Sequence, residues 1–113
     1  IPSGAYRIDD TGSARILAMK TALAHGFPIA IAVEVDSAFE NWDGNSPMGA
    51  PDPSQILGGH YIYVTGYSVS NGKTIFEGPN SWTSSWGDFG FWIGNEAFIG
   101  AAQDIYVADV KIA

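Results

Sequence analysis

The side chains that could carry chemistry are concentrated in two short segments. Residues 57–68, LGGHYIYVTGYS, hold His60 directly after two glycines, and residues 78–92, GPNSWTSSWGDFGFW, hold Asn80 among serines and tryptophans. An imidazole can take up and release a proton near neutral pH, and an amide oxygen can fix the ring in one orientation. Taken alone, a histidine after two glycines is more often a structural residue, and an asparagine after a proline is an ordinary turn residue.

Several kinds of site are disfavoured by the composition of the chain. It has no cysteine, which excludes a disulfide, a thiolate zinc site and a thiol nucleophile within it. Ser81 and Ser84 follow Asn80 closely, but no G-x-S-x-G spacing is present to favour a serine triad. The only two histidines, His25 and His60, are far apart in the sequence, and the acidic residues do not match a calcium loop. We therefore expect no metal site and no cofactor.

The joint pattern of the two segments resembles the right-hand, β-rich domain of the papain-like cysteine peptidases (C1-type). In that family a Gly-His or Asn-His pair opens a strand that ends in Gly-Tyr, and here GH and GY stand at the two ends of GHYIYVTGY. The second family motif is Asn-Ser-Trp-Gly, followed by Trp-Gly and then Gly-Tyr or Gly-Phe, and here the stretch reads NSWTSSWGDFGF. The resemblance covers roughly residues 13–110.

The resemblance implies roles for individual residues. His60 is similar to the general base of the family, Asn80 to the residue that orients the imidazole, and Trp82 to the indole that covers their contact. The chemistry explains these residue types, because an imidazolium stabilises a thiolate and later gives its proton to the leaving amine. An indole over the pair would exclude water and strengthen its hydrogen bond. The motif places three further residues in support of this site: Gly59, Ser81 and Trp86.

The resemblance also implies that half of the catalytic machinery is missing. The cysteine and the glutamine of the family lie on a left-hand, helical domain, and nothing in this chain resembles that segment. We expect residues 1–113 to be a single domain, the right-hand His/Asn half, with the left-hand Cys-bearing half absent. Its expected partners are a Cys-bearing left-hand domain or chain and a peptide or protein substrate. The isolated chain should be inactive, and its face around His60 should expose apolar and aromatic side chains.

Two other interpretations remain open. A catalytically inactive papain-like domain could serve as a binding or structural module in a larger surface or virion assembly. Alternatively, the aromatic cluster could bind carbohydrate or peptide. Two departures from the family pattern lie beside the expected site: Thr83 stands where glycine is usual, and Pro79 stands where a basic residue is common.

The hairpin that would carry the two segments sets a geometric condition. If Asn71 and Gly72 formed an ideal two-residue turn, Tyr63 would face Asn80, and His60 would lie on the opposite face from Asn80. A one-residue bulge or a three-residue loop would restore them to one face. The sequence therefore predicts an irregular turn.

The elements needed to position these residues are of mixed type. Ser13 is expected to cap a helix with the body ARILAMKTALAH, which ends at His25 and Gly26. We then expect a buried strand at 28–35, a helical turn at 37–42, a long loop at 43–59, hairpin strands at 60–67 and 73–78, and strands at 91–93 and 104–112. Trp86, Phe89 and Trp92 are expected in the core. This order predicts an α+β fold with one N-terminal helix and an antiparallel sheet or half-barrel.

Composition limits the partners and the location. The chain has 113 residues, of which 46% are hydrophobic and 15% charged, with a formal net charge of -7. This apolar content supports a folded core. The five basic residues do not cluster, so we expect neither nucleic acid nor a membrane as a partner. The chain reads as soluble, and a secreted location or a place in a larger assembly is compatible with the sequence.

Overall fold

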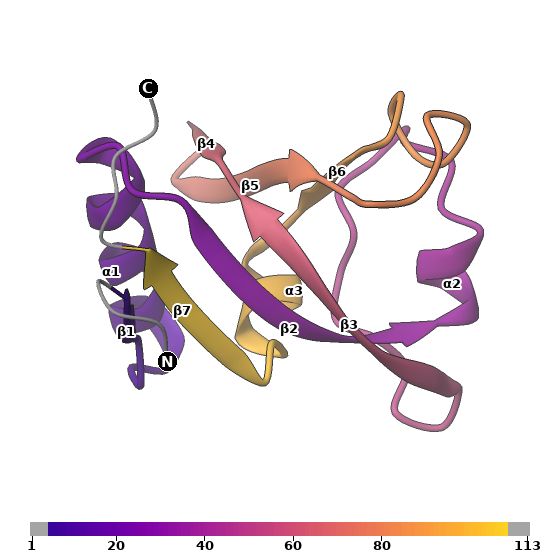
Figure 1. Ribbon diagram of the computed structural model, residues 1–113, viewed down its shortest axis with the longest axis horizontal. Helices are drawn as coiled ribbons and strands as arrows, with labels where there is room; N and C mark the ends of the chain where they lie inside the picture. The colour runs from indigo at the N-terminus through magenta and orange to yellow at the C-terminus, as the bar shows by residue number, and fades with distance from the viewer. Residues whose placement is uncertain (1–4, 109–113) are drawn as a thin grey trace.

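The structure is a computed structural model that describes residues 5–108. It has the expected α+β class, with antiparallel pairing between the named strands. The elements in chain order are β1 (Ala5–Arg7), α1 (Gly12–Ala24), β2 (Ile29–Asp36), α2 (Ser37–Glu40), β3 (Ile56–Val64), β4 (Gly66–Ser70), β5 (Lys73–Pro79), β6 (Phe91–Gly94), α3 (Glu96–Gly100) and β7 (Asp104–Ala108). Figure 1 shows α1 and α2 at opposite ends of the molecule, with β2 and β3 running between them.

The strands form two sheets that share one continuous stretch of chain. One sheet has the order β1-β7-β2-β3, and the other has the order β4-β5-β6. The chain leaves the first sheet at Val64 and enters the second at Gly66, and the intervening Thr65 donates its backbone N–H to the carbonyl of Glu77 at 2.9 Å. The single strand expected at 60–67 is therefore wrong, because it consists of two strands that belong to different sheets.

The turn between β4 and β5 is a regular two-residue turn. Ser70 pairs with Lys73, and the two residues between them, Asn71 and Gly72, have φ values of 51° and 75°. Positive φ at both positions matches the right-handed twist of the flanking strands, and asparagine and glycine tolerate it best. The predicted irregular turn is wrong. The break that allows His60 and Asn80 to meet lies at Thr65, where the chain changes sheets.

A close backbone approach joins the two sheets at Gly78 on β5. A Cβ atom on Gly78 would overlap the carbonyl oxygen of Tyr63 on β3. The same carbonyl accepts a hydrogen bond of 3.1 Å from the indole Nε1–H of Trp92 on β6. Glycine is therefore required at this crossing for steric reasons.

One hydrophobic core fills the space between the sheets and the helices. The inner face of the first sheet contributes alternate residues of its strands, as the period of two predicts. Helix α1 contributes Met19, and helix α3 contributes Phe98 and Ile99. The fully buried large side chains are Trp92, Phe76, Met19, Ile29, Ile31, Ile99, Ile105, Val64 and Val107.

The ends of α1 agree only in part with the expectation. The helix begins at Gly12 after Thr11, which makes no side-chain capping bond, so Ser13 lies inside the first turn and is not the cap. At the other end His25 is the C-cap residue, and its Nδ1 lies 2.8 Å from the carbonyl oxygen of Thr21. Gly26 follows with a φ of 85°, the left-handed conformation expected of a glycine that ends a helix.

Other boundaries also differ from the sequence predictions. The loop expected at 43–59 ends at residue 55, because residues 56–59 pair with the end of β2. Strand β1 and helix α3 were not expected from the sequence. Helix α2 and strand β6 lie where a helical turn and a strand were predicted. The strand predicted at 104–112 is present over 104–108, and its remainder lies outside the described residues. Between residues 5 and 108, no helix is long and apolar enough to cross a membrane.

Candidate active site

The structure brings His60 and Asn80 together from two different sheets. His60 lies on β3 opposite Val33 of β2, and Asn80 directly follows β5. The Nε2 atom of His60 lies 2.8 Å from Oδ1 of Asn80, a distance typical of a strong hydrogen bond. An amide oxygen only accepts, so the ring must donate through Nε2–H. A neutral His60 therefore carries its lone pair on Nδ1.

Aromatic rings enclose this pair. The indole of Trp82 stacks on the imidazole of His60, with ring centroids 5.2 Å apart and planes at 21°. The ring of Phe39, from α2, stands edge-on to both at 6.4 Å and 5.4 Å. Such a shell keeps water from the hydrogen bond and raises its strength.

Backbone hydrogen bonds hold the loop that carries Asn80 and Trp82. The N–H of Asn80 donates to the carbonyl of Gly90 at 2.9 Å, and the N–H of Gly90 donates to the carbonyl of Trp86 at 2.8 Å. The indole Nε1–H of Trp86 donates to the carbonyl of Phe39 at 3.1 Å. The loop is thereby fixed to α2, and the position of Asn80 follows from these contacts.

Only the oxygen of the Asn80 side-chain amide is hydrogen-bonded among the described residues. The residue is 8% exposed, and within the described residues its Nδ2 atom has no hydrogen-bond partner. Buried polar atoms are normally paired. The site therefore retains one buried donor beside the imidazole.

The other residues expected at the site differ in what they contribute. Trp86 is buried and stacks on Phe39 with ring centroids 5.2 Å apart. Gly59 lies next to His60 on β3, but a Cβ there would meet nothing, so no steric need for glycine exists. Ser81 is exposed, and its side chain makes no hydrogen bond among the described residues.

Phe89 is not in the core, contrary to expectation, whereas Trp86 and Trp92 are. Phe89 is 85% exposed and has a φ of 53°. It occupies a tight turn in which Asp88 and Phe91 exchange backbone hydrogen bonds of 3.1 Å and 3.0 Å. The left-handed conformation at the tip of this turn directs the side chain outward.

The sequence prediction missed Phe39 as part of the site. Its ring is 3% exposed and contacts the rings of His60, Trp82 and Trp86. Its backbone N–H donates a 2.8 Å hydrogen bond to Oδ1 of Asp36, which caps α2. An Asp three residues before an aromatic residue is a signal for such a cap.

An exposed aromatic surface lies on β3, the strand that carries His60. Tyr61 and Tyr63 are each 59% exposed, and Leu57 is 60% exposed. Since side chains alternate along a strand, the two tyrosines lie on the face opposite to His60. Between residues 5 and 108 no group of three histidine or carboxylate side chains is placed to hold a metal ion.

Comparison with known proteins relates this geometry to a family. The family model described as papain family cysteine protease matches residues 5–102. The chain belongs to this family. Cysteine-type proteolysis is the activity for which the papain family is named.

Individual members of the papain family match over much of the chain. The cathepsin B-like cysteine proteinase 6 of Caenorhabditis elegans is 32% identical over 89 residues, which cover 79% of this chain and 22% of that protein. The cysteine proteinase RD21A of Arabidopsis thaliana is 36% identical over 74 residues, which cover 65% of this chain and 15% of that protein. The chain thus spans a minor part of the length of these relatives.

Solved papain-family structures share the fold. The bromelain protease of Ananas comosus, in complex with the E64 inhibitor, superimposes with a TM-score of 0.72 at 22% identity, covering 96% of this chain and 51% of bromelain. The proCathepsin B S9 of Trypanosoma congolense gives a TM-score of 0.70 at 19% identity, covering 96% of this chain and 36% of the other. At these identities the likeness concerns the fold.

Proposed function

We propose that this chain is the His/Asn-bearing half of a papain-like cysteine peptidase and hydrolyses peptide bonds with a thiol from outside these 113 residues. His60 serves as general base and then as general acid, and Asn80 orients its ring. The cysteine belongs to a left-hand domain or chain, and the substrate is a peptide or protein. Trp82 shields the His60–Asn80 contact, with Trp86 behind it.

The observation that supports this proposal is the 2.8 Å contact between Nε2 of His60 and Oδ1 of Asn80. It commits Nε2 to donation and leaves Nδ1 as the basic atom. Nδ1 then accepts the proton of the thiol, and the thiolate attacks the peptide carbonyl. The imidazolium returns its proton to the leaving amine, and water later releases the acyl group from sulfur.

Asn80 suits this sequence of steps because its amide is neutral. A carboxylate in its place would add a charge beside the imidazolium, whereas the amide fixes the ring without changing the net charge of the site. The stack of Trp82 on the ring limits rotation of the imidazole. Both contacts keep Nδ1 pointed to one place.

Reconstitution with a Cys-bearing papain-like left-hand domain tests the proposal. The isolated chain should hydrolyse no peptide or ester substrate above a His60→Ala control, because it contains no thiol. With the left-hand domain added, peptidase activity should appear and should fall by about 10² to 10⁴ in His60→Ala, the range for loss of a general acid–base group. Activity of the isolated chain that His60→Ala abolishes would instead favour a serine nucleophile.

The lack of cysteine favours one second candidate, a catalytically inactive papain-like module used for binding in a larger assembly. The coding sequence upstream of Ile1 separates the two. A glutamine followed shortly by Cys-Gly-x-Cys-Trp would favour the peptidase. An upstream segment of this family without that cysteine would favour the module.

A further inference from the structure

A hollow lies beside α2, apart from the His60–Asn80 pair. It has a volume of about 220 Å³ and is formed by the end of β2, α2, the loop at 46–51 and one residue of α3. None of His60, Asn80 and Trp82 lines it. A binding site there would be distinct from the proposed catalytic pair.

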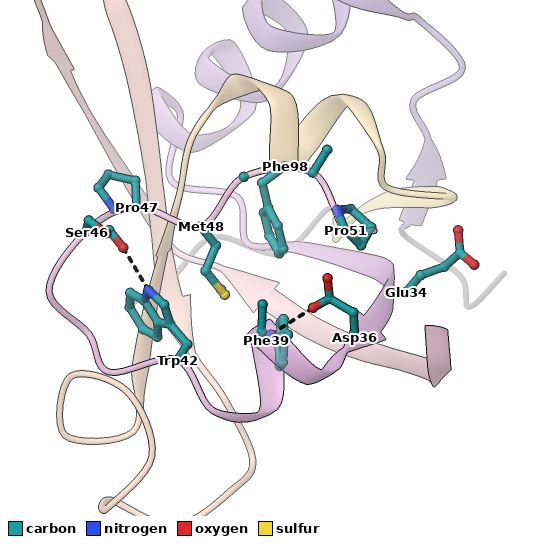
Figure 2. A pocket seen from close by; sticks show the side chains of 12 residues that line it. Glu34, Asp36, Phe39, Trp42, Ser46, Pro47, Met48, Pro51 and Phe98 are labelled. Atoms are coloured by element: carbon teal, nitrogen blue, oxygen red, sulfur yellow. Dashed lines mark hydrogen bonds between the residues drawn. The ribbon is translucent and has the colours of Figure 1, made fainter. Parts of the chain in front are cut away.

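The walls of this α2 cavity are mainly apolar and aromatic. Figure 2 shows Trp42, Met48, Phe39 and Phe98 arranged side by side around it. Phe39, Met48 and Phe98 are buried, and Trp42 is half-buried. Aromatic faces of this kind attract cations through their ring quadrupoles, tryptophan most strongly.

Hydrogen bonds fix the loop that forms one wall of the cavity. The indole Nε1–H of Trp42 donates to the carbonyl of Ser46 at 2.7 Å. The N–H of Met48 donates to the carbonyl of Ile93 on β6, and its carbonyl accepts from the N–H of Asn95, the N-cap residue of α3, both at 2.9 Å. The loop is therefore preorganised, which lowers the cost of binding.

Two acidic residues line this cavity at the end away from Trp42, Asp36 with its carboxylate toward Phe39 and Glu34 at the rim with its carboxylate directed outward (Figure 2). Asp36 is 6% exposed and already accepts backbone N–H groups of Phe39 and Asp52 at 2.8 Å and 3.0 Å. Glu34 is half-buried at the rim near Pro51 (Figure 2), and its side chain makes no hydrogen bond among the described residues. The ion pairs found between residues 5 and 108 all involve Arg7, so neither carboxylate has a cationic partner there.

We infer that the α2 cavity binds the side chain of an arginine presented by a peptide or protein segment. Its guanidinium pairs with Glu34 and Asp36, and its aliphatic stem lies along Met48 and the aromatic rings. The planar, weakly hydrated guanidinium suits stacking and bidentate contact with a carboxylate better than an ammonium group does.

Size and charge both favour this occupant. The cavity, at about 220 Å³, is smaller than the roughly 300 to 1,000 Å³ of sites that take drug-sized ligands, so a single side chain fits better than a whole metabolite. The net charge of -7 would also draw a basic segment toward the chain. The inference does not depend on the proposed peptidase activity.

Titration of the 113-residue chain with acetyl-Ala-Arg-Ala-amide tests this inference. We expect saturable NMR shifts at the indole N–H of Trp42 and the methyl group of Met48, with a dissociation constant on the order of 1 mM. The same peptide with citrulline, which is isosteric with arginine and uncharged, should bind markedly less well. A lysine peptide should bind less well than the arginine peptide.

Three variants locate the site. Glu34→Gln should raise the dissociation constant of the arginine peptide by about twofold to fivefold, the range for one partly exposed ion pair. Ala50→Phe, at an exposed position that lines the cavity, should abolish binding by filling it while both carboxylates remain. Glu40→Gln makes the same change of charge at an exposed position on α2 outside the cavity, and should leave binding unchanged.

Several results would overturn the inference. Equal binding of the arginine and citrulline peptides would show that charge is not recognised. Shifts that spread over the acidic surface without saturating, or equal effects of Glu34→Gln and Glu40→Gln, would show only general attraction to a negatively charged protein. Unchanged binding in Ala50→Phe would place the peptide elsewhere.

Discussion

At the scale of single residues, the imidazole of His60 has two unlike sides. Nε2 faces the buried amide of Asn80 beneath the indole of Trp82. Nδ1 makes no hydrogen bond among the described residues. A ring held on one side and free on the other is suited to exchange protons with an external group.

The protection of the His60 Nε2 proton from exchange with water can be measured directly. We predict that Asn80→Ala speeds exchange of this ring proton with water by roughly fivefold or more, since a net hydrogen bond contributes about 1 kcal/mol. Trp82→Ala should also speed it, because the covering ring is lost. Proton NMR of the histidine ring N–H groups provides the measurement.

The second histidine is an internal control for this experiment. His25 is exposed at the end of α1, far along the chain from Asn80. Its ring proton should exchange at the same rate in all three proteins. Unchanged exchange at His60 in both variants would mean that the contact gives no protection from solvent.

At the scale of elements, one buried arginine joins α1 to α3. Arg15 is 9% exposed, and its Nη1 donates to the carbonyls of Ile99, Gly100 and Ala102 at 2.9 Å, 3.2 Å and 3.1 Å. Ile99 and Gly100 end α3 and Ala102 follows it, at a helix end where carbonyls run short of helical N–H partners; the carbonyl of Ile99 also accepts the backbone N–H of Ala102 at 3.1 Å. Arg15 thus caps a helix of only five residues from a neighbouring helix.

We predict that Arg15→Met lowers the free energy of unfolding by about 2 to 4 kcal/mol, because buried carbonyls would lose a charged donor. Urea denaturation followed by circular dichroism measures this change. Lys20→Met removes the same charge from the same helix at a position whose side chain makes no hydrogen bond among residues 5–108, and should stay within about 0.5 kcal/mol of the native chain. Equal effects of the two substitutions would rule out the capping role.

The close approach of β3 and β5 at Gly78 should make a larger residue there destabilising. Gly78→Ala should destabilise the chain by about 3 kcal/mol or more, since the new methyl group would overlap the backbone of Tyr63 in a packed interior. Gly58→Ala on β3 is the matched control, because a Cβ there meets nothing. Thermal unfolding of both variants compares them, and similar midpoints would contradict the steric argument.

The sequence predicted those elements whose signals are local. Helix α1 follows from the spacing of its apolar residues, β2 from its β-branched run, and the chain reversal at 71–72 from Asn-Gly. The passage from one sheet to the other at Thr65 left no local signal, because it depends on which strands lie nearby. For the same reason the partners of His60 were expected from a motif, while the ring of Phe39 was missed.

At the scale of the whole molecule, β3 has two unlike faces. The inner face of β3 joins the core, whereas its outer face presents Tyr61 and Tyr63 opposite the small residues Ala32 and Ala30 of β2. Large rings beside small side chains make a raised aromatic ridge rather than a polar face. Exposed apolar patches of this kind usually mark a surface that another chain or domain covers.

A negatively charged chain with such a face should self-associate once its charge is screened. We predict that the native chain forms dimers in sedimentation velocity at about 1 M salt, where electrostatic screening acts within roughly 3 Å. The double substitution Tyr61→Ser and Tyr63→Ser should keep the chain monomeric. Val69→Ser changes an apolar residue that is 54% exposed on β4, in the other sheet, and should leave dimers in place. Association that survives the tyrosine substitutions and disappears with Val69→Ser would move the self-association surface from β3 to β4.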